Sequence, residues 1–305
     1  MNVGVVGIGS MGQNHVRVYS EIDGCELAGI ADSNEEVANE FATKYNTKAV
    51  YNYKKLLDYG VEAVSIAVPT SLHCEVASFF LENGVHCLVE KPIASRLEDG
   101  RKMTEIAKKN NVKLMIGHIE RFNPVVQEMK QIIEEGILGK ILIISSRRVG
   151  PFAPRIVDVG ITIDLATHDI DIARYFCGKE PTKICSIYGS IRHSKEDHAM
   201  LLLDFDGVSA SIEVNWFTPH KVRTAVVTGT DGIAYLDYID QHITIFNSKW
   251  KKEPKIEKAE PLRKELEHFI YCIKNDKEPL VDGNDALKTL EVAIKATHAG
   301  SNKFR

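Results

Sequence analysis

A carboxylate and a cation end an apolar run in the stretch HCLVEKPIAS, residues 86–95. Glu90 and Lys91 follow Cys87-Leu88-Val89, and Pro92 comes directly after the lysine. Proline biases the preceding residue toward extended geometry, so Lys91 is expected in one backbone state, with a cis Lys91–Pro92 bond as one option. Most lysines are simply solvated. A cation held rigidly at a strand end, however, can stabilise negative charge that develops on a substrate oxygen, so Lys91 is a catalytic candidate.

Glycines at the start of the chain form a second group of candidates. Gly7, Gly9 and Gly12 make a GxGxxG pattern directly after an apolar run. Such glycines permit a tight turn, a close approach of the backbone to pyrophosphate, and close helix packing. Asp32 follows at the separation of roughly 20 residues at which a carboxylate accepts hydrogen bonds from a ribose 2′-hydroxyl. A 2′-phosphate would meet a like charge there, and Ser33-Asn34-Glu35 contain no arginine, so the pattern predicts NAD rather than NADP.

A third group lies in GITIDLATHDIDIARYF. One face of a helix would carry four polar residues at i, i+4, i+7 and i+11, namely Asp164, His168, Asp171 and Tyr175. Histidine titrates near neutral pH and suits proton transfer. The alternative is that Asp164 caps the helix and His168 is a satisfied polar residue. No metal is expected, because no spacing fixes a third and a fourth ligand.

The elements that must position these residues alternate strictly in the first part of the chain. Strands are expected at 2–6, 26–31, 63–68, 87–89 and 113–116, with helices between them. Capping boxes are expected at Ser33 with Glu36 and at Ser95 with Glu98. This alternation predicts a doubly wound parallel sheet, an α/β Rossmann domain over residues 1–120, in which ligands lie outside the carboxyl ends of the strands. The expected cofactor-binding residues are Gly7, Gly9, Ser10, Met11, Gly12, Asp32, Val68, Pro69, Thr70, His73, Glu90 and Lys91.

The pattern changes after residue 120. Asn123 and Pro124 predict the start of a helix that runs to residue 135. Long β-type runs follow at 140–149, 182–191, 199–205, 208–216, 221–228 and 233–236, with Asp-Gly turns that are typical of hairpins. Two helices, at 262–275 and 284–297, close the chain. We therefore expect an α+β domain over residues 121–305 with a large, mainly antiparallel open sheet, and a homodimer or homotetramer formed through that sheet.

Composition excludes several classes of function. The chain has 305 residues, 44% of them hydrophobic, and a formal net charge of −4, which gives no basic excess for binding nucleic acid. No apolar run approaches the roughly 18–20 residues that span a bilayer, and the chain opens on a strand-like run rather than a signal sequence. The six cysteines form no CxxC pair. We expect a cytoplasmic protein whose partners are small molecules.

The three groups together, in this order, resemble the Gfo/Idh/MocA oxidoreductases over nearly the whole chain. The resemblance implies NAD-dependent hydride transfer to or from a sugar. It also implies that Lys91 hydrogen-bonds the reacting sugar oxygen, that His168 acts as the acid/base, and that Asp164 assists or orients it.

Four further stretches look similar to those of one subgroup, the UDP-N-acetylglucosamine 3-dehydrogenases. They are GHIERFNP, RRVGPFAPRIVDVG, IDLATHDID and NWFTPHKVR. This similarity implies oxidation of the C3 hydroxyl of a UDP-sugar to a ketone, a step in amino-sugar biosynthesis.

Charge supports a nucleotide on the substrate. Residues 136–157 contain no acidic residue but include Lys140, Arg147, Arg148 and Arg155, and arginine binds phosphate oxygens in pairs. We expect Arg147, Arg148 and Arg155 to join Lys91, Asp164 and His168 in substrate binding. Because adjacent residues of a strand point to opposite faces, at least one of Arg147 and Arg148 is expected at the surface or in an interface.

Two alternatives remain open at this stage. The first is another dehydrogenase of the same family, acting on a sugar, an inositol or a UDP-sugar acid. The second is a catalytically inactive NAD-binding regulator that keeps the fold, because a fold does not establish a function.

Overall fold

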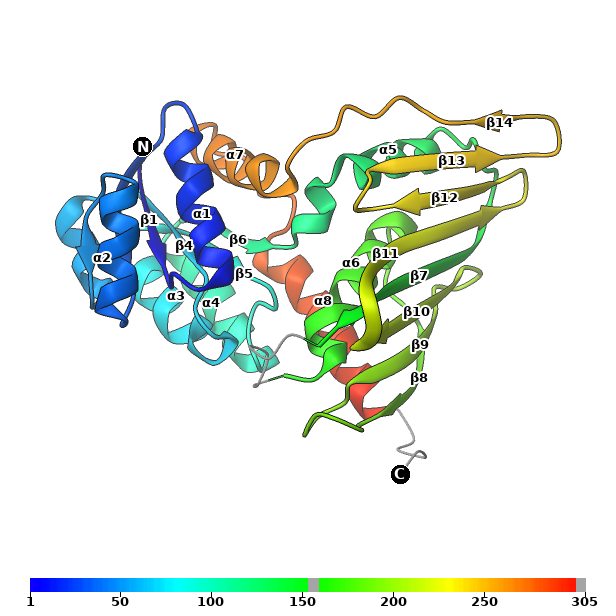
Figure 1. Ribbon diagram of the computed structural model, residues 1–305, viewed down its shortest axis with the longest axis horizontal. Helices are drawn as coiled ribbons and strands as arrows, with labels where there is room; N and C mark the ends of the chain where they lie inside the picture. Colours follow the sequence, from blue (N-terminus) through cyan, green and yellow to red (C-terminus); the bar gives the residue numbers. More distant parts are fainter. Residues whose placement is uncertain (153–158, 300–305) are drawn as a thin grey trace. The chain divides into compact units, whose positions relative to one another are not determined.

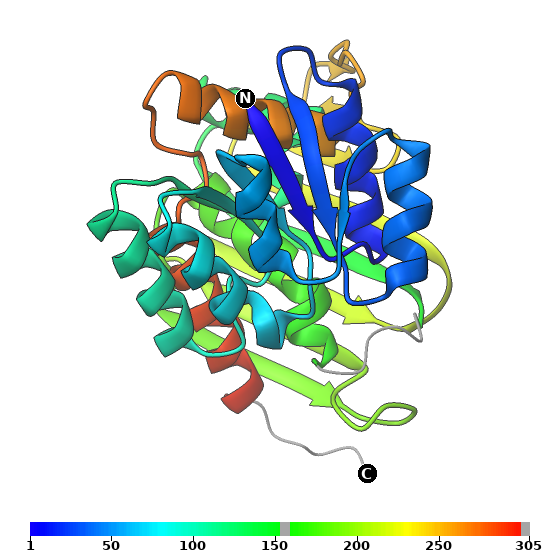
Figure 2. The same ribbon diagram turned by 90° about the vertical axis from the view of Figure 1, so that its left-hand side faces the viewer.

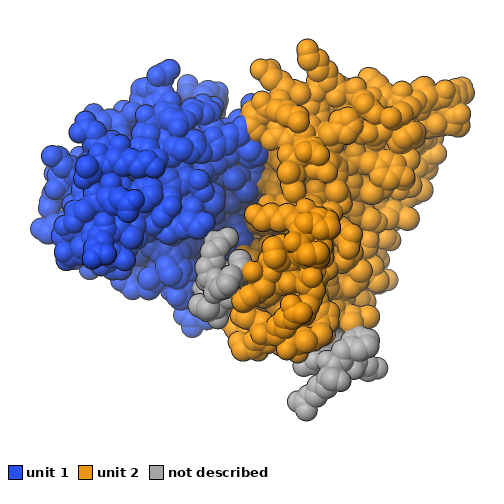
Figure 3. All heavy atoms as spheres, in the orientation of Figure 1, with its two compact units in different colours: residues 1–119, 260–287 blue, residues 120–259, 288–305 orange. Residues whose placement is uncertain are grey.

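The computed structural model describes residues 1–152 and 159–299. The chain forms two compact units, coloured separately in Figure 3. Unit 1 contains residues 1–119 and 260–287, and unit 2 contains residues 120–259 and the chain from residue 288. The expected second domain, 121–305, differs from unit 2, because the segment 260–287 returns to unit 1 and its helix α7 (Pro261–Lys274) packs on α1 (Ser10–Glu21).

Unit 1 is built on a parallel sheet of six strands in the order β3-β2-β1-β4-β5-β6. Figure 1 labels four of them, β1, β4, β5 and β6. The central strands are buried along nearly their whole length because helices cover both faces, as their continuous apolar sequence predicts. The strand order reverses between β1 and β4, which is where ligands bind in such sheets. The strands are β1 (Asn2–Val6), β2 (Glu26–Ala31), β3 (Ala49–Val50), β4 (Ala63–Ile66), β5 (His86–Glu90) and β6 (Leu114–Gly117).

The crossover helices of unit 1 are α1, α2 (Glu35–Lys44), α3 (His73–Glu82) and α4 (Leu97–Lys109). Right-handed crossovers place α1 and α2 on one face of the sheet and α3 and α4 on the other (Figure 2). Both predicted capping boxes are wrong by one residue. Asn34, not Ser33, accepts the amides of the first turn of α2, and Arg96, not Ser95, precedes α4 without a side-chain cap.

Unit 2 contains an eight-stranded sheet in the order β14-β13-β12-β11-β7-β10-β9-β8. All neighbours are antiparallel except β7 and β10. Burial alternates along β9 and β10, as expected for strands with one buried face. The strands are β7 (Ile141–Pro151), β8 (Lys183–Gly189), β9 (His198–Asp204), β10 (Ser209–Asn215), β11 (Phe217–Gly229), β12 (Ile233–Asp237), β13 (His242–Phe246) and β14 (Lys251–Lys252).

Helices cover one face of this sheet. The apolar core of unit 2 lies between the sheet and three helices, α5 (Pro124–Glu134), α6 (Thr167–Cys177) and the C-terminal part of α8 (Gly283–His298) (Figure 1). Asn123 caps α5 through its side chain, as predicted. Within the described ranges, no helix is long and apolar enough to cross a membrane.

The other face of the sheet exposes apolar side chains. Ile143, Ile187, Met200, Leu202 and Tyr235 lie on it, each between 43% and 56% exposed. A patch of this kind is typical of a protein–protein interface. Self-association through this sheet stays a prediction.

Two adjacent arginines on β7 have opposite environments. Arg147 lies on the open face, where its Nε is 3.0 Å from Glu213 Oε2. Arg148 is only 1% exposed on the helix-covered face and donates to Asp169 of α6 and to Glu120, both at 2.7 Å. Burial alone would lower the pKa of Arg148, but the two carboxylates raise it above its ordinary value. This network ties α6 to the sheet.

Arg148→Ala is therefore expected to destabilise unit 2 by about 3–5 kcal/mol, because it leaves two buried carboxylates without their cation. The matched variant Arg147→Ala, which removes only an exposed pair, is expected to cost about 0.5 kcal/mol or less. Chemical denaturation of both variants measures the difference. Equal losses of stability would contradict the assignment of Arg148 as the buried member.

Candidate functional site

Three glycines shape the loop between β1 and α1, each for a different reason. Gly7 has φ of +87°, and a Cβ there would lie 2.8 Å from the backbone of Ala67. A Cβ on Gly12 would collide with the carbonyl oxygen of Gly7. A Cβ on Gly9 would meet nothing within 4 Å. The loop is thus tight against the protein at two positions and open at the third, which is the arrangement that lets a pyrophosphate approach the backbone.

The first turn of α1 faces the same opening. Gly9 is its N-cap and provides no side-chain hydrogen bond, and the turn contains no acidic residue. Ser10 is exposed and Met11 is half-buried. Unsatisfied amides at the positive end of a helix favour an anion. The loop and this turn therefore fit the diphosphate of a dinucleotide.

Asp32, at the end of β2, is fixed beside this loop. Its Oδ2 accepts the amide of Ile8 at 2.6 Å, and its Oδ1 accepts the amide of Asn34 at 2.8 Å. The side chain is half-buried. A carboxylate oxygen has more than one lone pair, so Asp32 can still accept ribose hydroxyls.

The ends of β4 and β5 are joined by a buried histidine. His73, the first residue of α3, is 1% exposed, with Nδ1 3.0 Å from the carbonyl oxygen of Pro92 and Nε2 3.1 Å from that of Val68. Burial lowers its pKa, although both carbonyls oppose this. Pro69 is exposed and Thr70 begins a short 3₁₀ turn, Thr70–Leu72. His73 thus connects the segments that follow β4 and β5 in the interior of unit 1. Val68, Pro69 and Thr70 lie at the carboxyl edge of the sheet, where the cofactor is expected.

Glu90 and Lys91 end β5 in different environments. Glu90 is 8% exposed, its carboxylate lies against Gly117, and its Oε1 is 2.9 Å from Nε2 of His15 on α1. Burial would raise the pKa of Glu90, but the hydrogen bond and charge of His15, followed by the charge of Lys91, lower it. Lys91 is half-buried and precedes a cis bond to Pro92. The sequence analysis missed His15, whose only signal was its position three residues after Gly12.

In unit 2, Asp164 and His168 occupy a wider helical segment than expected. Residues Thr162–Ala166 form a π-helical turn that leads into α6, so the prediction of one regular α-helix is wrong here. Both side chains are half-buried. Asp164 caps neither segment, because Ile161 and Ala166 hold the N-cap positions, so the capping alternative is also wrong. Such π-turns occur frequently at functional sites.

The remaining members of the predicted polar stripe belong to the core. Asp171 is 1% exposed and accepts two hydrogen bonds from Arg121, at 2.6 and 2.7 Å. Tyr175 is half-buried, and its ring centroid lies 4.9 Å from the guanidinium carbon of Arg121. Only Asp164 and His168 therefore remain as candidates for chemistry on this segment.

The basic residues expected to bind substrate separate in the structure. Arg148 is buried and engaged by Asp169 and Glu120, so the expectation that it binds substrate is wrong. Arg147 lies on the open face of the sheet, opposite α6. Arg155 lies outside the described residues.

Another arginine takes the place expected for Arg148. It is the last residue of the stretch NWFTPHKVR, which the sequence analysis quoted without naming this residue as a candidate. Arg223 on β11 pairs in register with Arg148 and shares its face, but its side chain is 35% exposed. Its guanidinium makes a loose ion pair with Glu120 at 3.7 Å. Burial, followed by the charge of Arg148, lowers its pKa, whereas the charges of Glu120, Asp169 and Asp164 raise it. Arg223 is therefore a partly exposed cation within electrostatic range of Asp164.

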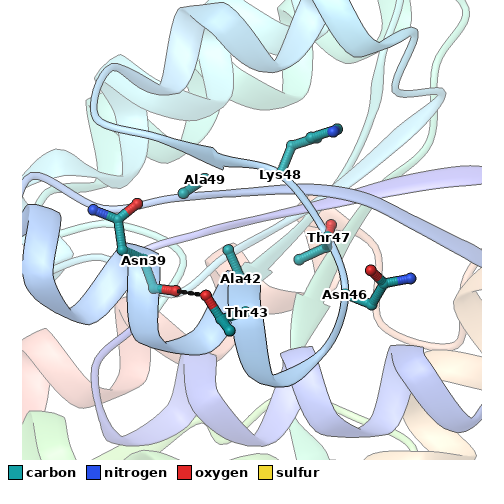
Figure 4. A pocket seen from close by; sticks show the side chains of 7 residues that line it. All are labelled: Asn39, Ala42, Thr43, Asn46, Thr47, Lys48 and Ala49. Carbon is teal, nitrogen blue, oxygen red and sulfur yellow. Dashed lines mark hydrogen bonds between the residues drawn. The ribbon is translucent and has the colours of Figure 1, made fainter.

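A shallow hollow of about 390 Å³ at the C-terminal end of α2 is a poorer candidate (Figure 4). Its lining comes from α2 and the segment before and into β3, residues 39–49. This segment lies at the amino end of the parallel strands. Ligands of doubly wound sheets bind at the carboxyl ends, so the hollow is not part of the dinucleotide site.

Two family models match the chain. The first is described as an oxidoreductase family with an NAD-binding Rossmann fold and matches residues 1–118, and the second is the GFO/IDH/MocA C-terminal domain and matches residues 126–235. The chain belongs to the Gfo/Idh/MocA oxidoreductases. The predicted family, the predicted combination of a Rossmann domain with a mainly antiparallel one, and NAD as the cofactor are thereby confirmed.

Relatives of this Gfo/Idh/MocA chain match it over nearly its full length. It is 29% identical over 306 residues to UDP-N-acetylglucosamine 3-dehydrogenase of Acidithiobacillus ferrooxidans, which covers 97% of this chain and 96% of that one. It is 31% identical over 325 residues to scyllo-inositol 2-dehydrogenase (NAD(+)) of Bacillus subtilis, with 98% and 93% covered. A solved structure of the Acidithiobacillus enzyme has a TM-score of 0.92, with 98% and 97% covered at 29% identity. These relatives support an oxidoreductase of the sugar and polyol dehydrogenase group.

Asp32 generates a prediction about cofactor choice. Asp32→Ser with Ser33→Arg is expected to weaken NADH binding and to strengthen NADPH binding, each by about tenfold or more, because a like charge is replaced by a phosphate partner. Ser33 is the better site for the arginine, since Asn34 caps α2. Titrating both reduced cofactors by fluorescence, without substrate, measures the shift. Wild-type protein that binds NADPH as tightly as NADH would contradict the role of Asp32.

Proposed function

We propose that the protein oxidises the C3 hydroxyl of UDP-N-acetylglucosamine to the 3-keto sugar, with NAD as the hydride acceptor. The observation that carries this proposal is Arg223, a partly exposed cation on the same sheet face as the buried network and within electrostatic range of Asp164. A UDP-sugar carries two phosphates, whereas an inositol carries no charge. The similarity to the Acidithiobacillus enzyme over both units supports the same substrate.

The residues of the chain divide the chemistry between them. When NAD is bound, it supplies the acceptor for the hydride that leaves the C3 carbon. His168 takes the proton of the C3 hydroxyl, since histidine is the side chain best suited to exchange a proton near neutral pH. Asp164, about one helical turn before it, orients His168. Lys91 donates a hydrogen bond to the sugar oxygen and stabilises the negative charge that develops as the proton leaves.

The cofactor edge of unit 1 holds Lys91 in place for this role. The amide of Lys91 lies 3.3 Å from Glu90 Oε2, and His73 bonds to the carbonyl that follows, that of Pro92. These contacts fix the backbone on both sides of the lysine. A catalytic group needs such support, because a small misplacement costs a large factor in rate.

Arg223 distinguishes the proposal from the nearest alternative. An enzyme for scyllo-inositol, such as the Bacillus subtilis relative, has no phosphate to bind. The buried arginine, Arg148, is neutralised by two carboxylates, so within this network Arg223 is the cation with exposed surface. Its planar fork matches phosphate oxygens.

A catalytically inactive regulator is the other alternative. It would need the glycine loop and Asp32 but would have no use for Lys91, Asp164 and His168 together. The presence of all three favours a dehydrogenase.

Lys91→Ala and His168→Ala are each expected to reduce kcat by about 10² or more, because proton transfer or charge stabilisation is lost. NADH binding should change little in either variant. The controls Lys55→Ala and His242→Ala replace exposed residues of the same types and should match the wild type. Stopped-flow measurement of NADH formation at 340 nm, the absorbance of the cofactor, gives kcat. Near-normal turnover in either variant would remove that residue from the mechanism.

Arg223→Ala is expected to raise the KM for UDP-N-acetylglucosamine about tenfold or more, since a hydrogen bond to a charged group is lost. Arg223→Lys keeps the charge but not the planar fork, so its KM should lie between those of wild type and Arg223→Ala. Arg147→Ala, on the open face, is the control and should not change KM. The difference in KM between wild type and Arg223→Ala should shrink as added salt screens the contact between Arg223 and the diphosphate.

The same assay separates the alternatives by substrate. Wild-type protein that oxidises free N-acetylglucosamine or scyllo-inositol as efficiently as the UDP-sugar would contradict the nucleotide requirement. That result would favour a plain sugar or inositol dehydrogenase.

A further inference from the structure

A second carboxylate is buried in unit 1 near Glu90. Glu265 of α7 is 0% exposed, and neither of its carboxylate oxygens has a hydrogen-bond partner among the described residues. Its neighbours on α7, Leu266 and Phe269, are also fully buried and apolar. An ionised carboxylate in such surroundings would be strongly disfavoured. The burial of Glu265 therefore needs an explanation other than an ion pair.

Glu90, at the end of β5, acts on Glu265 through its charge, and Glu265 acts on Tyr19 of α1, the helix against which α7 packs. His15 of α1 and the amide of Lys91 contact Glu90. His73 of α3 also acts on Glu90 through its charge. Tyr19 is satisfied by Ser65, with the two hydroxyl oxygens 2.8 Å apart. Glu90 is thus the group nearby that carries a negative charge, and His15 is bonded to it rather than to Glu265.

Two carboxyl groups in one buried region cannot both ionise without a cation for each. Burial raises the pKa of Glu265 well above its usual range, and the charge of Glu90 raises it further. The pKa of Glu90 moves the other way, because His15 and Lys91 outweigh its burial. The environment therefore places the proton on Glu265 and the negative charge on Glu90.

We propose that Glu265 is a protonated carboxylic acid at neutral pH and a positioning residue that keeps Glu90 ionised beside His15 and Lys91. Glu90 Oε2 lies 3.3 Å from the amide of Lys91, and Glu90 Oε1 is bonded to His15. If Glu265 lost its proton, two negative charges would compete for His15 and for the cation of Lys91. The contacts of Glu90 with the amide of Lys91 and with His15 would then weaken. The kinetic part of this proposal rests on the proposed role of Lys91, whereas the protonation state does not.

Stability against pH tests the protonation state. The folded pKa of Glu265 is raised, so from its ordinary value of 4.5 upward the unfolded chain releases a proton that the folded chain retains. Wild-type stability therefore falls as pH rises through this window, and the loss is complete only above the folded pKa. Glu265→Gln cannot ionise and should escape this loss. The melting temperature of the variant relative to wild type should rise by about 2–4 °C per pH unit above 4.5.

The matched control is Glu267→Gln on the same helix, where the carboxylate is 50% exposed and lies 3.9 Å from Arg263. Its melting difference from wild type should not grow with pH. Infrared difference spectra of wild type minus Glu265→Gln at pH 7 should show the C=O stretch of a protonated acid, and those with Glu267→Gln should not. Absence of this C=O band, or a difference in melting temperature between Glu265→Gln and wild type that does not change with pH, would overturn the assignment of Glu265 as a protonated acid.

The positioning role has its own readout. The ratio of kcat between Glu265→Gln and wild type should rise at least about threefold from pH 6 to pH 9, while the KM for NAD stays constant. The rise is expected because only the wild type gains a second charge beside Glu90. The same ratio for Glu267→Gln should stay flat. A flat ratio for Glu265→Gln overturns the positioning role. Neither the melting nor the infrared result depends on which sugar is the substrate, so failure of the proposed function is separately recognisable.

Discussion

Burying a carboxylate costs several kcal/mol unless a cation or a hydrogen-bond donor lies beside it, or unless it keeps its proton. Both units bury carboxylates, and together they use all of these solutions. Asp169 and Glu120 share Arg148, Asp171 faces Arg121, and Glu90 is bonded to His15. These pairs join elements that are far apart in the sequence, so they fix α6 to its sheet and α1 to the end of β5.

The same constraint decides which cations remain for a substrate. Arg148 lies between two buried carboxylates, so its charge is neutralised within the fold. Its cross-strand neighbour Arg223 is partly exposed and makes only a loose ion pair. On the opposite face of the strand, Arg147 meets Glu213. Three arginines within two strands thus have three different environments, and burial separates them although their chemistry is identical.

Local signals predicted much of this architecture. The bounds of β1 and β2 follow directly from their apolar runs, and the GxGxxG spacing predicted the tight turn between β1 and α1, because these features depend on neighbours in sequence. The errors arose where distant residues decide. Arg148 and Asp169 are 21 residues apart and Arg121 and Asp171 are 50 apart, so no periodicity reveals which charged residues are neutralised in the core. The π-turn before α6 was equally hidden, because the segment has an ordinary helical pattern. The return of α7 to unit 1 depends on its packing against α1, which its own amphipathic pattern does not specify.

That return has a consequence for recombination between relatives. A cut near residue 120 keeps all six strands of the parallel sheet together, but α7, in the segment 260–287, supplies part of the interior of unit 1. A chimera that exchanged only the first 119 residues would place a foreign α1 against the native α7, and the charge that acts on Glu265 would come from a carboxylate of another lineage. The unit that can be exchanged between relatives is therefore discontinuous. An exchange that keeps the interior of unit 1 intact must include both residues 1–119 and residues 260–287.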